Sequence, residues 1–194
     1  MNRARWGIRW WHIAAALALT ALLDLYELAV TIPELAEFAD GPIFDTRVGG
    51  YSSGEAVRLL TALGSEGRWY YLTRHLTADT VLALIEAAAI ILIILRVTRP
   101  GARFAVPVPP KWRMALLAAP VLTLIFDLGE NALVAGMLVD AAPAVTEIAL
   151  TSTLTQAKWV CASISIALAI VLPLTAWRRG RKHRAGQPQQ PSPH

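Results

Sequence analysis

Cysteine is almost absent from this chain of 194 residues, and the single Cys161 excludes two kinds of chemistry. No disulfide can form within the chain, and a C-x-x-C redox pair is impossible. Histidine is also scarce, with four in the chain. None supplies the Glu-x-x-His pattern of di-iron helix bundles. Only His75, just before the predicted second span, could contribute to a site inside the bundle. Neither a Ser-His-Asp set nor a phosphate-binding loop is present.

Charged residues are few, at 16%, and hydrophobic residues make up 55% of the sequence. Both values are unlike those of a soluble domain. Four apolar segments reach the ~20 residues that a membrane-spanning helix needs. They cover residues 11–31, 79–97, 113–139 and 152–177. Because these runs are continuous, a membrane β-barrel with short alternating segments is excluded. We predict an all-α membrane protein in which residues 1–177 form one four-transmembrane-helix bundle.

The basic residues are unevenly distributed and predict the orientation of the bundle. Lys and Arg cluster before the first span, between the second and third spans, and after the fourth span. The loop after the third span has Asp140 and Glu147 but no Lys or Arg. By the positive-inside rule, both termini are cytoplasmic. The net charge of +4 is therefore a topology signal, and nucleic acid is not an expected partner. The basic and Pro/Gln-rich tail, 178–194, is predicted to be disordered, with its basic run on anionic membrane lipid.

The first connection, residues 32–78, is long and carries helix signals of its own. Ser52 and Glu55 form a capping box, Gly64 is a helix stop, and Ser65 is a new N-cap. The pattern predicts two short helices that cover the outer end of the bundle. The segment with Trp69, Tyr70 and Tyr71 is expected to lie at the outer interface, aromatic side inward, before turning into the second span.

Ionisable residues lie inside the predicted spans, where each costs about 2.5–3.5 kcal/mol on insertion scales. Helix rise places all of them in the outer half of the bilayer, and each span has one polar stripe at a similar depth. The stripes should therefore converge inside the bundle. The intramembrane set is Asp24, Glu27, Glu86, Asp127, Glu130 and Lys158.

Five acids against one lysine leave a surplus of four negative charges in this set. Protonation, a bound cation, or arginines of the outer loop would neutralise it. The candidate arginines are Arg47, Arg58, Arg68 and Arg74. Oxygen ligands suit a divalent cation such as Mg²⁺, Ca²⁺ or Mn²⁺, for which Asp127, Glu130 and Asp24 are the candidates. The alternative is a structural role, in which Lys158 and one acid form an ordinary ion pair between helices.

Four stretches carry a resemblance to a known group of proteins. The loop reads Asp45-x-Arg47-x-x-Gly50-Tyr51-Ser52-x-x-Glu55-Ala56 and then Leu63-Gly64-x-x-Gly67-Arg68-x-x-Tyr71. The third span has Asp127-x-x-Glu130-Asn131, and the fourth has Lys158. Over roughly residues 45–165 the chain resembles a group of small four-span prokaryotic membrane proteins of unassigned role. Leu82, Ala83 and Glu86 depart from the Phe-Pro pair and the Tyr expected after Asp79.

The resemblance implies a prokaryotic plasma (inner) membrane and the four-span fold, and it supplies no substrate. It singles out Arg68, Tyr71, Asp127, Glu130, Asn131 and Lys158. With the intramembrane acids, the predicted ligand-binding residues are Asp24, Glu27, Arg68, Tyr71, Glu86, Asp127, Glu130, Asn131 and Lys158.

Three functions fit these patterns. The first is a carboxylate-rich cavity in the outer leaflet that binds a small polar ligand, a cation or a lipid headgroup. The second is a membrane-embedded enzyme with a buried carboxylate as general acid or base. The third is a non-catalytic subunit that binds a partner membrane protein through its loop. A cavity lined by several acids would favour the first two functions. Acids that form ion pairs with the arginines of the loop would favour the third. Transport across the membrane has less support, because the parts of the spans in the inner half of the bilayer are apolar and offer no polar path for a substrate.

Overall fold

The computed structural model describes residues 8–100, 105–140 and 142–185, and these ranges contain helices and connections but no strand. The first connected helical stretch consists of α1 (Trp10–Tyr26), the π-helical turn η1 (Glu27–Thr31) and α2 (Ile32–Ala39). A 3-10 turn, η2 (Phe44–Thr46), follows. The second stretch consists of α3 (Ser53–Tyr70), the π-helical turn η3 (Tyr71–His75) and α4 (Leu76–Val97). The last two helices are α5 (Pro110–Val139) and α6 (Val145–Ala185).

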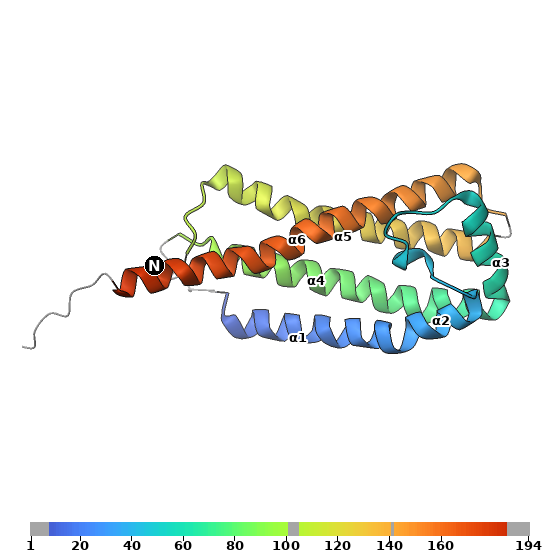
Figure 1. Cartoon of the computed structure of the whole chain (residues 1–194), viewed down its shortest axis with the longest axis horizontal. Helices are drawn as coiled ribbons and strands as arrows, with labels where there is room; N and C mark the ends of the chain where they lie inside the picture. Colours follow the sequence, from blue (N-terminus) through green and yellow to red (C-terminus); the bar gives the residue numbers. More distant parts are fainter. Residues whose placement is uncertain (1–7, 101–104, 141, 186–194) are drawn as a thin grey trace, which may run out of the picture.

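Four helical stretches are long and apolar enough to cross a membrane, which confirms the predicted all-α, four-helix fold. They cover Trp10–Ala39, Ser53–Val97, Pro110–Val139 and Val145–Arg181. The start of α1 and the end of α6 lie at one end of the elongated bundle, and α2 and α3 lie at the other (Figure 1). Helix α4 packs against α1, α5 and α6, and α5 packs most extensively on α6.

The outer connection is helical, as the sequence predicts, and its start signals are present. The Ser52 hydroxyl accepts a hydrogen bond from the Glu55 amide at 3.3 Å, and the Glu55 carboxylate accepts one from the Ser52 amide at 2.7 Å. Gly64 interrupts the helix with φ of 58°, a conformation that glycine adopts without the strain of a side chain. Pro33 is the second residue of α2 and lies inside the connected α1–η1–α2 stretch, where it contributes no N–H donor to the helix.

One prediction about this connection is wrong. The segment with Trp69 and Tyr71 does not turn along the interface, because the helix continues through η3 directly into α4. Trp69 is 67% exposed, while Tyr71 is fully buried in the core beneath the loop. The aromatic residues therefore divide between the outer surface and the interior.

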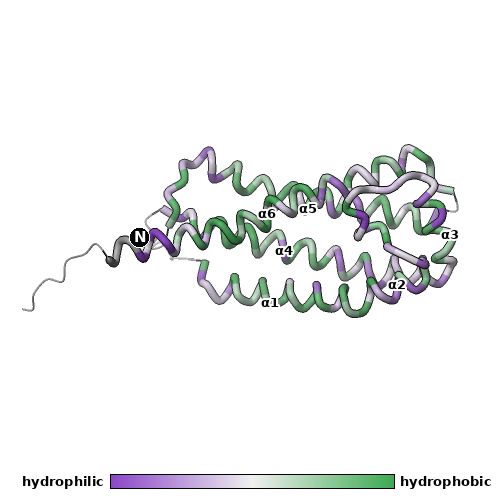
Figure 2. Tube along the Cα trace, in the orientation of Figure 1, coloured by the Kyte–Doolittle hydropathy of each residue, from purple (hydrophilic) through white to green (hydrophobic). Residues whose placement is uncertain are grey.

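Apolar packing forms two separate cores, with a polar level between them. The outer core joins the loop to the spans and includes Leu35, Phe44, Leu60 and Met137. The inner core lies nearer the chain ends and consists of Ile90, Ile94, Val97, Leu172 and Ala176. Figure 2 shows hydrophilic positions within the half of the bundle next to the loop helices, and mostly hydrophobic spans from there toward the start of α1. The polar side chains are thus held at one depth.

The disorder predicted from residue 178 is wrong for the part of the tail that the structure describes. Helix α6 continues to Ala185, because a helix already nucleated in a span is readily extended by arginine and lysine. Arg181 lies over the Trp177 ring, 4.9 Å from its centroid. The predictions for the basic residues Arg3, Arg5 and Arg103 and for residues 186–194 of the tail lie outside the described residues.

Candidate functional site

Lys158 of α6 is the centre of the polar level, with three carboxylates around its ammonium group. Its Nζ lies 2.5 Å from Glu130 Oε2 and 3.3 Å from Asp127 Oδ1, both on α5. It also lies 3.4 Å from Oδ1 of Asp45. Thr155, one turn before Lys158, donates its hydroxyl to Glu130 Oε1 at 2.6 Å. Lys158 is thus a shared counter-charge for three acids.

Asp45 is a member of this cluster that the intramembrane set does not include. The 3-10 turn η2 carries it from the loop into the bundle, where Ile43 and Phe44 are fully buried beside it. The Tyr71 hydroxyl donates to Asp45 Oδ2 at 2.5 Å, and the Trp159 indole donates to the Asp45 backbone carbonyl at 3.0 Å. The loop is therefore fastened to the spans at a charged residue.

Several groups act on the ionisation of Asp45, which lies outside the spans. Burial alone would raise the pKa of this carboxyl. Lys158 opposes that effect, together with the hydrogen bonds and charge supplied by His75 and Tyr71, and the net result is a pKa below the ordinary value of 3.8. Asp45 is therefore an anion held by its partners.

The two π-helical turns meet at His75, the last residue of η3. Its Nδ1 lies 2.8 Å from the hydroxyl of Thr31, the last residue of η1, and its Nε2 lies 3.3 Å from Asp45 Oδ2. Both side chains are buried. Since π turns widen a helix and occur often at functional sites, their pairing here marks a specialised region of the bundle.

Asn131 and Asp79 form a second polar pair at the same level. The Asn131 amide donates to Asp79 Oδ2 at 2.6 Å, across the α4–α5 contact. Asp79 is buried and lies four residues after His75 on the continuous α3–α4 helix. The predicted member Asn131 is thus in the polar level, although it does not contact Lys158.

A cavity of about 370 Å³ opens beside the Lys158 cluster, between α1 and α6. Trp159, Leu28, Ile32 and Leu82 contribute apolar parts of its wall. Its ionisable lining residues are Asp24, Glu27, Asp79, Glu86, Asp127 and Lys158. The structure therefore brings Asp24, Glu27, Glu86, Asp127 and Lys158 to one cavity, while Glu130 and Tyr71 lie in the adjoining hydrogen-bond network.

Glu27 is the least compensated acid in this wall. Glu27 is only 6% exposed, and its Oε1 atom has no hydrogen-bond partner among the described residues. Asp24, one turn earlier on α1, lies at an exposed position, and Glu86 is half-buried. Lys158 already serves three other carboxylates. The cavity thus has more carboxyl groups than cationic partners.

The arginines of the loop do not supply the missing charge, so this expectation is wrong for Arg68 and Arg47. Arg68 donates instead to backbone carbonyls of Leu60, at 3.0 Å, and Asp140, at 2.9 Å. Arg47 lies 3.7 Å from Glu55 and donates to the Pro42 carbonyl. Guanidinium groups match carbonyls at helix ends, where backbone acceptors lack helical partners. Arg68 is consequently outside the acidic cluster.

The predicted divalent-cation site is also not assembled. Within the described part of the chain, no group of three or more His, Cys, Asp or Glu side chains is arranged to hold a metal ion. Asp127 and Glu130 face the Lys158 ammonium, and Asp24 lies on the other side of the cavity on α1. The ammonium therefore occupies the position that a cation would need.

The ligand-binding residues predicted from the sequence do not include Asp45. His75 is predicted only as a histidine that could reach the site. Depth along a span identifies an intramembrane acid, but Asp45 comes from a turn with no periodic pattern. The available signal was its position at the head of the D-x-R-x-x-G-Y-S motif. No family model matches the chain, and neither a curated protein nor a solved structure matches it. The resemblance to four-span prokaryotic proteins thus stays a prediction.

Proposed function

We propose that this protein is a membrane protein that binds a small ligand carrying a positively charged ammonium group in the cavity between α1 and α6. The observation that carries the proposal is the buried Glu27 carboxylate, which lines the cavity and has an oxygen without a partner in the described chain. A buried charge is tolerated when it is paired, and a ligand cation would supply that pair. Placement of the protein in a prokaryotic plasma membrane with cytoplasmic termini is part of the proposal.

The size and lining of the cavity agree with a small amphipathic ligand. A volume of about 370 Å³ lies within the range of small-molecule sites. Apolar walls with a few charged groups are typical of such sites, since the charged groups fix the orientation of the ligand. Asp24 at the exposed rim and Glu27 inside would offer two successive acids, at the end of α1 and the start of η1, to an entering cation.

The competing functions have less support from the geometry. The enzyme alternative would use one of the cavity carboxylates as general acid or base. His75 does not assist such a carboxylate from the cavity wall, because both its ring nitrogens are engaged and it is not among the residues lining the cavity. A purely partner-binding role would be favoured if the acids formed ion pairs with the arginines of the loop. Arg47 and Arg68 instead contact Glu55 and backbone carbonyls.

The test is binding of ethanolamine to the protein purified in a neutral detergent, measured by calorimetry and by the shift in thermal midpoint. Ethanolamine should raise the midpoint of the wild type, because it binds only the folded state. Glu27→Gln should weaken binding by about tenfold or more, the effect of one charge-assisted contact. Glu27→Gln should itself be as stable as the wild type or more stable, because glutamine keeps the size of the side chain and replaces a buried ionisable group that has no partner in the described chain.

Glu34→Gln is the matched control, since Glu34 is an exposed acid of the same helical stretch. It should bind ethanolamine like the wild type. A second arm compares phosphatidylethanolamine in mixed micelles, which separates a lipid headgroup from a free amine. Equal binding by wild type and Glu27→Gln, or no binding of either probe, would contradict the proposal.

A further inference from the structure

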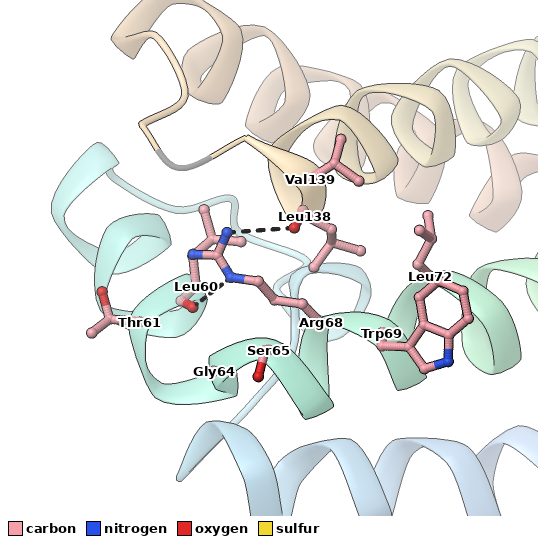
Figure 3. Close-up of a pocket in the computed structure, with 9 residues that line it drawn as sticks. All are labelled: Leu60, Thr61, Gly64, Ser65, Arg68, Trp69, Leu72, Leu138 and Val139. Atoms are coloured by element: carbon pink, nitrogen blue, oxygen red, sulfur yellow. Dashed lines mark hydrogen bonds between the residues drawn. The ribbon is translucent and has the colours of Figure 1, made fainter.

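A second groove lies at the outer end of the bundle, where α3 meets the end of α5, and it differs from the acidic cavity in charge. Its volume is about 610 Å³. Figure 3 shows Arg68 crossing the groove toward Leu138, with Trp69 and Leu72 further along the same helical stretch. Thr61 and Ser65 add hydroxyl groups. Gly64 leaves open space here, because a side chain at this position would meet nothing within 4 Å.

Arg68 gives this groove a fixed positive charge. Its Nε donates to the Leu60 carbonyl at 3.0 Å, and its Nη1 donates to the Asp140 carbonyl at 2.9 Å. These contacts hold the guanidinium plane in place. Arg68 Nη1 also lies 3.4 Å from the Leu138 carbonyl. These contacts use Nε and Nη1, and within the described residues Arg68 has no carboxylate partner and its Nη2 has no acceptor. A guanidinium oriented in this way is suited to a phosphate oxygen.

The groove continues along the seam between α4 and α5. A space of about 480 Å³ shares Leu72 with the first groove. Its walls are mostly apolar and include Leu76, Val81, Leu128, Ala132 and Ala135. Together the two spaces, which we call the α4–α5 groove, have a cationic outer end and an apolar inner part.

The length of the α4–α5 groove matches one leaflet of a bilayer. From Leu138 at the outer end of α5 to Leu128, helix rise gives about 15 Å, which is half of the ~30 Å hydrocarbon thickness. Trp69, 67% exposed, and Val139, 73% exposed, flank the outer end. Exposed tryptophan is typical of the level of lipid headgroups.

We propose that the α4–α5 groove binds one molecule of an anionic phospholipid. The phosphate contacts Arg68 with Ser65 and Thr61 nearby, and one acyl chain follows the α4–α5 seam toward Leu128. This site is separate from the acidic cavity, and its occupation does not depend on the function proposed for that cavity.

The experiment uses the delipidated full chain in neutral detergent, with phosphatidylglycerol, phosphatidylcholine or glycerol 3-phosphate added. Phosphatidylglycerol should raise the thermal midpoint by several degrees more than phosphatidylcholine does, and glycerol 3-phosphate should have no effect. Arg68→Gln should weaken phosphatidylglycerol binding by about ten- to hundredfold, measured by native mass spectrometry.

Because Arg68 also ties α3 to α5, a second variant leaves it unchanged. Ala132→Trp places a large side chain in the apolar part of the groove and should abolish the effect of phosphatidylglycerol. Ala149→Trp, at an exposed position of α6, is the matched control and should respond like the wild type. Equal stabilisation by both lipids, a full effect of glycerol 3-phosphate, or an undiminished effect in Ala132→Trp would each overturn the proposal.

Discussion

Four buried acids of the bundle, Asp45, Asp79, Asp127 and Glu130, each have a partner on another element. Lys158 joins α6 to α5 through Glu130 and Asp127, and to the loop through Asp45. When one member of a buried ion pair is removed, its partners stay buried without a counter-charge and keep their desolvation cost. The loss of stability is therefore larger than the net stabilisation that the intact pair provides. Loss of Lys158 should therefore be felt mainly through the acids that remain.

We expect Lys158→Met to lower the free energy of unfolding by about 3–5 kcal/mol, the cost of stranding buried partners. Glu130→Gln added to it should restore part of this loss. The measurement is unfolding in detergent at pH 7, with the exposed Lys111→Met as control. Strictly additive effects of Lys158→Met and Glu130→Gln would contradict the 2.5 Å contact between the two residues.

Asp45 predicts the acid sensitivity of the protein. Its pKa in the folded state is below the ordinary value of 3.8, so its ionisation stabilises the fold above that value and is lost as pH falls below it. The thermal midpoint should decline below about pH 4. Asp45→Asn should have a lower midpoint than wild type between pH 5 and 8, and a smaller further decline in acid. A variant that tracks the wild type at every pH would refute this role.

The helical elements differ in how far the sequence predicts them. Continuous apolar runs identify the spans, and local signals identify the Ser52 capping box and the break at Gly64. The sequence does not predict the π turns η1 and η3, which contact each other through Thr31 and His75, residues far apart in the chain. The predicted polar stripes explain why Glu27, Asp127 and Lys158 share a cavity. The loop arginines could not be placed, since charge alone does not distinguish a carboxylate from the carbonyls at a helix end.

The loop that carries Asp45 is held against α6 at a point where only glycine fits. Gly50 has φ of 80°, and a side chain there would come within 2.7 Å of Ser152 Oγ. Next to it, the Tyr51 amide donates to Ser152 Oγ at 2.8 Å. Gly50→Ala should therefore displace the loop and lower the free energy of unfolding by roughly 1–3 kcal/mol, through backbone strain and a lost contact.

Gly49→Ala provides the control for this element, because a side chain at Gly49 would meet nothing within 4 Å. It should change the thermal midpoint little. Limited proteolysis of the loop reports on the same event, with faster cleavage expected in Gly50→Ala alone. Equal stability of the two variants would mean that the loop is not docked on α6 at this residue.

At the scale of the whole molecule, the polar level divides the bundle unequally. The acidic cavity lies toward the end with the loop helices, and the inner core of Ile90, Ile94 and Leu172 separates it from the other end. The end of α4, the start of α5 and the end of α6 lie at that other end (Figure 1), and they carry or adjoin the basic residues Arg96, Arg99, Lys111 and Arg178. Charge distribution and packing therefore assign different surroundings to the two ends of the bundle.

This asymmetry predicts the orientation in the membrane. Because Lys and Arg are retained on the cytoplasmic side, the end with the start of α1 and the end of α6 should face the cytoplasm. A reporter active only in the cytoplasm should give a signal when fused at residue 194 and none when fused at residue 140, which follows α5 at the loop end. Immunoblots for equal amounts of both fusions serve as control. The reverse pattern would place the acidic cavity in the cytoplasmic leaflet, where a ligand would reach Glu27 from inside the cell.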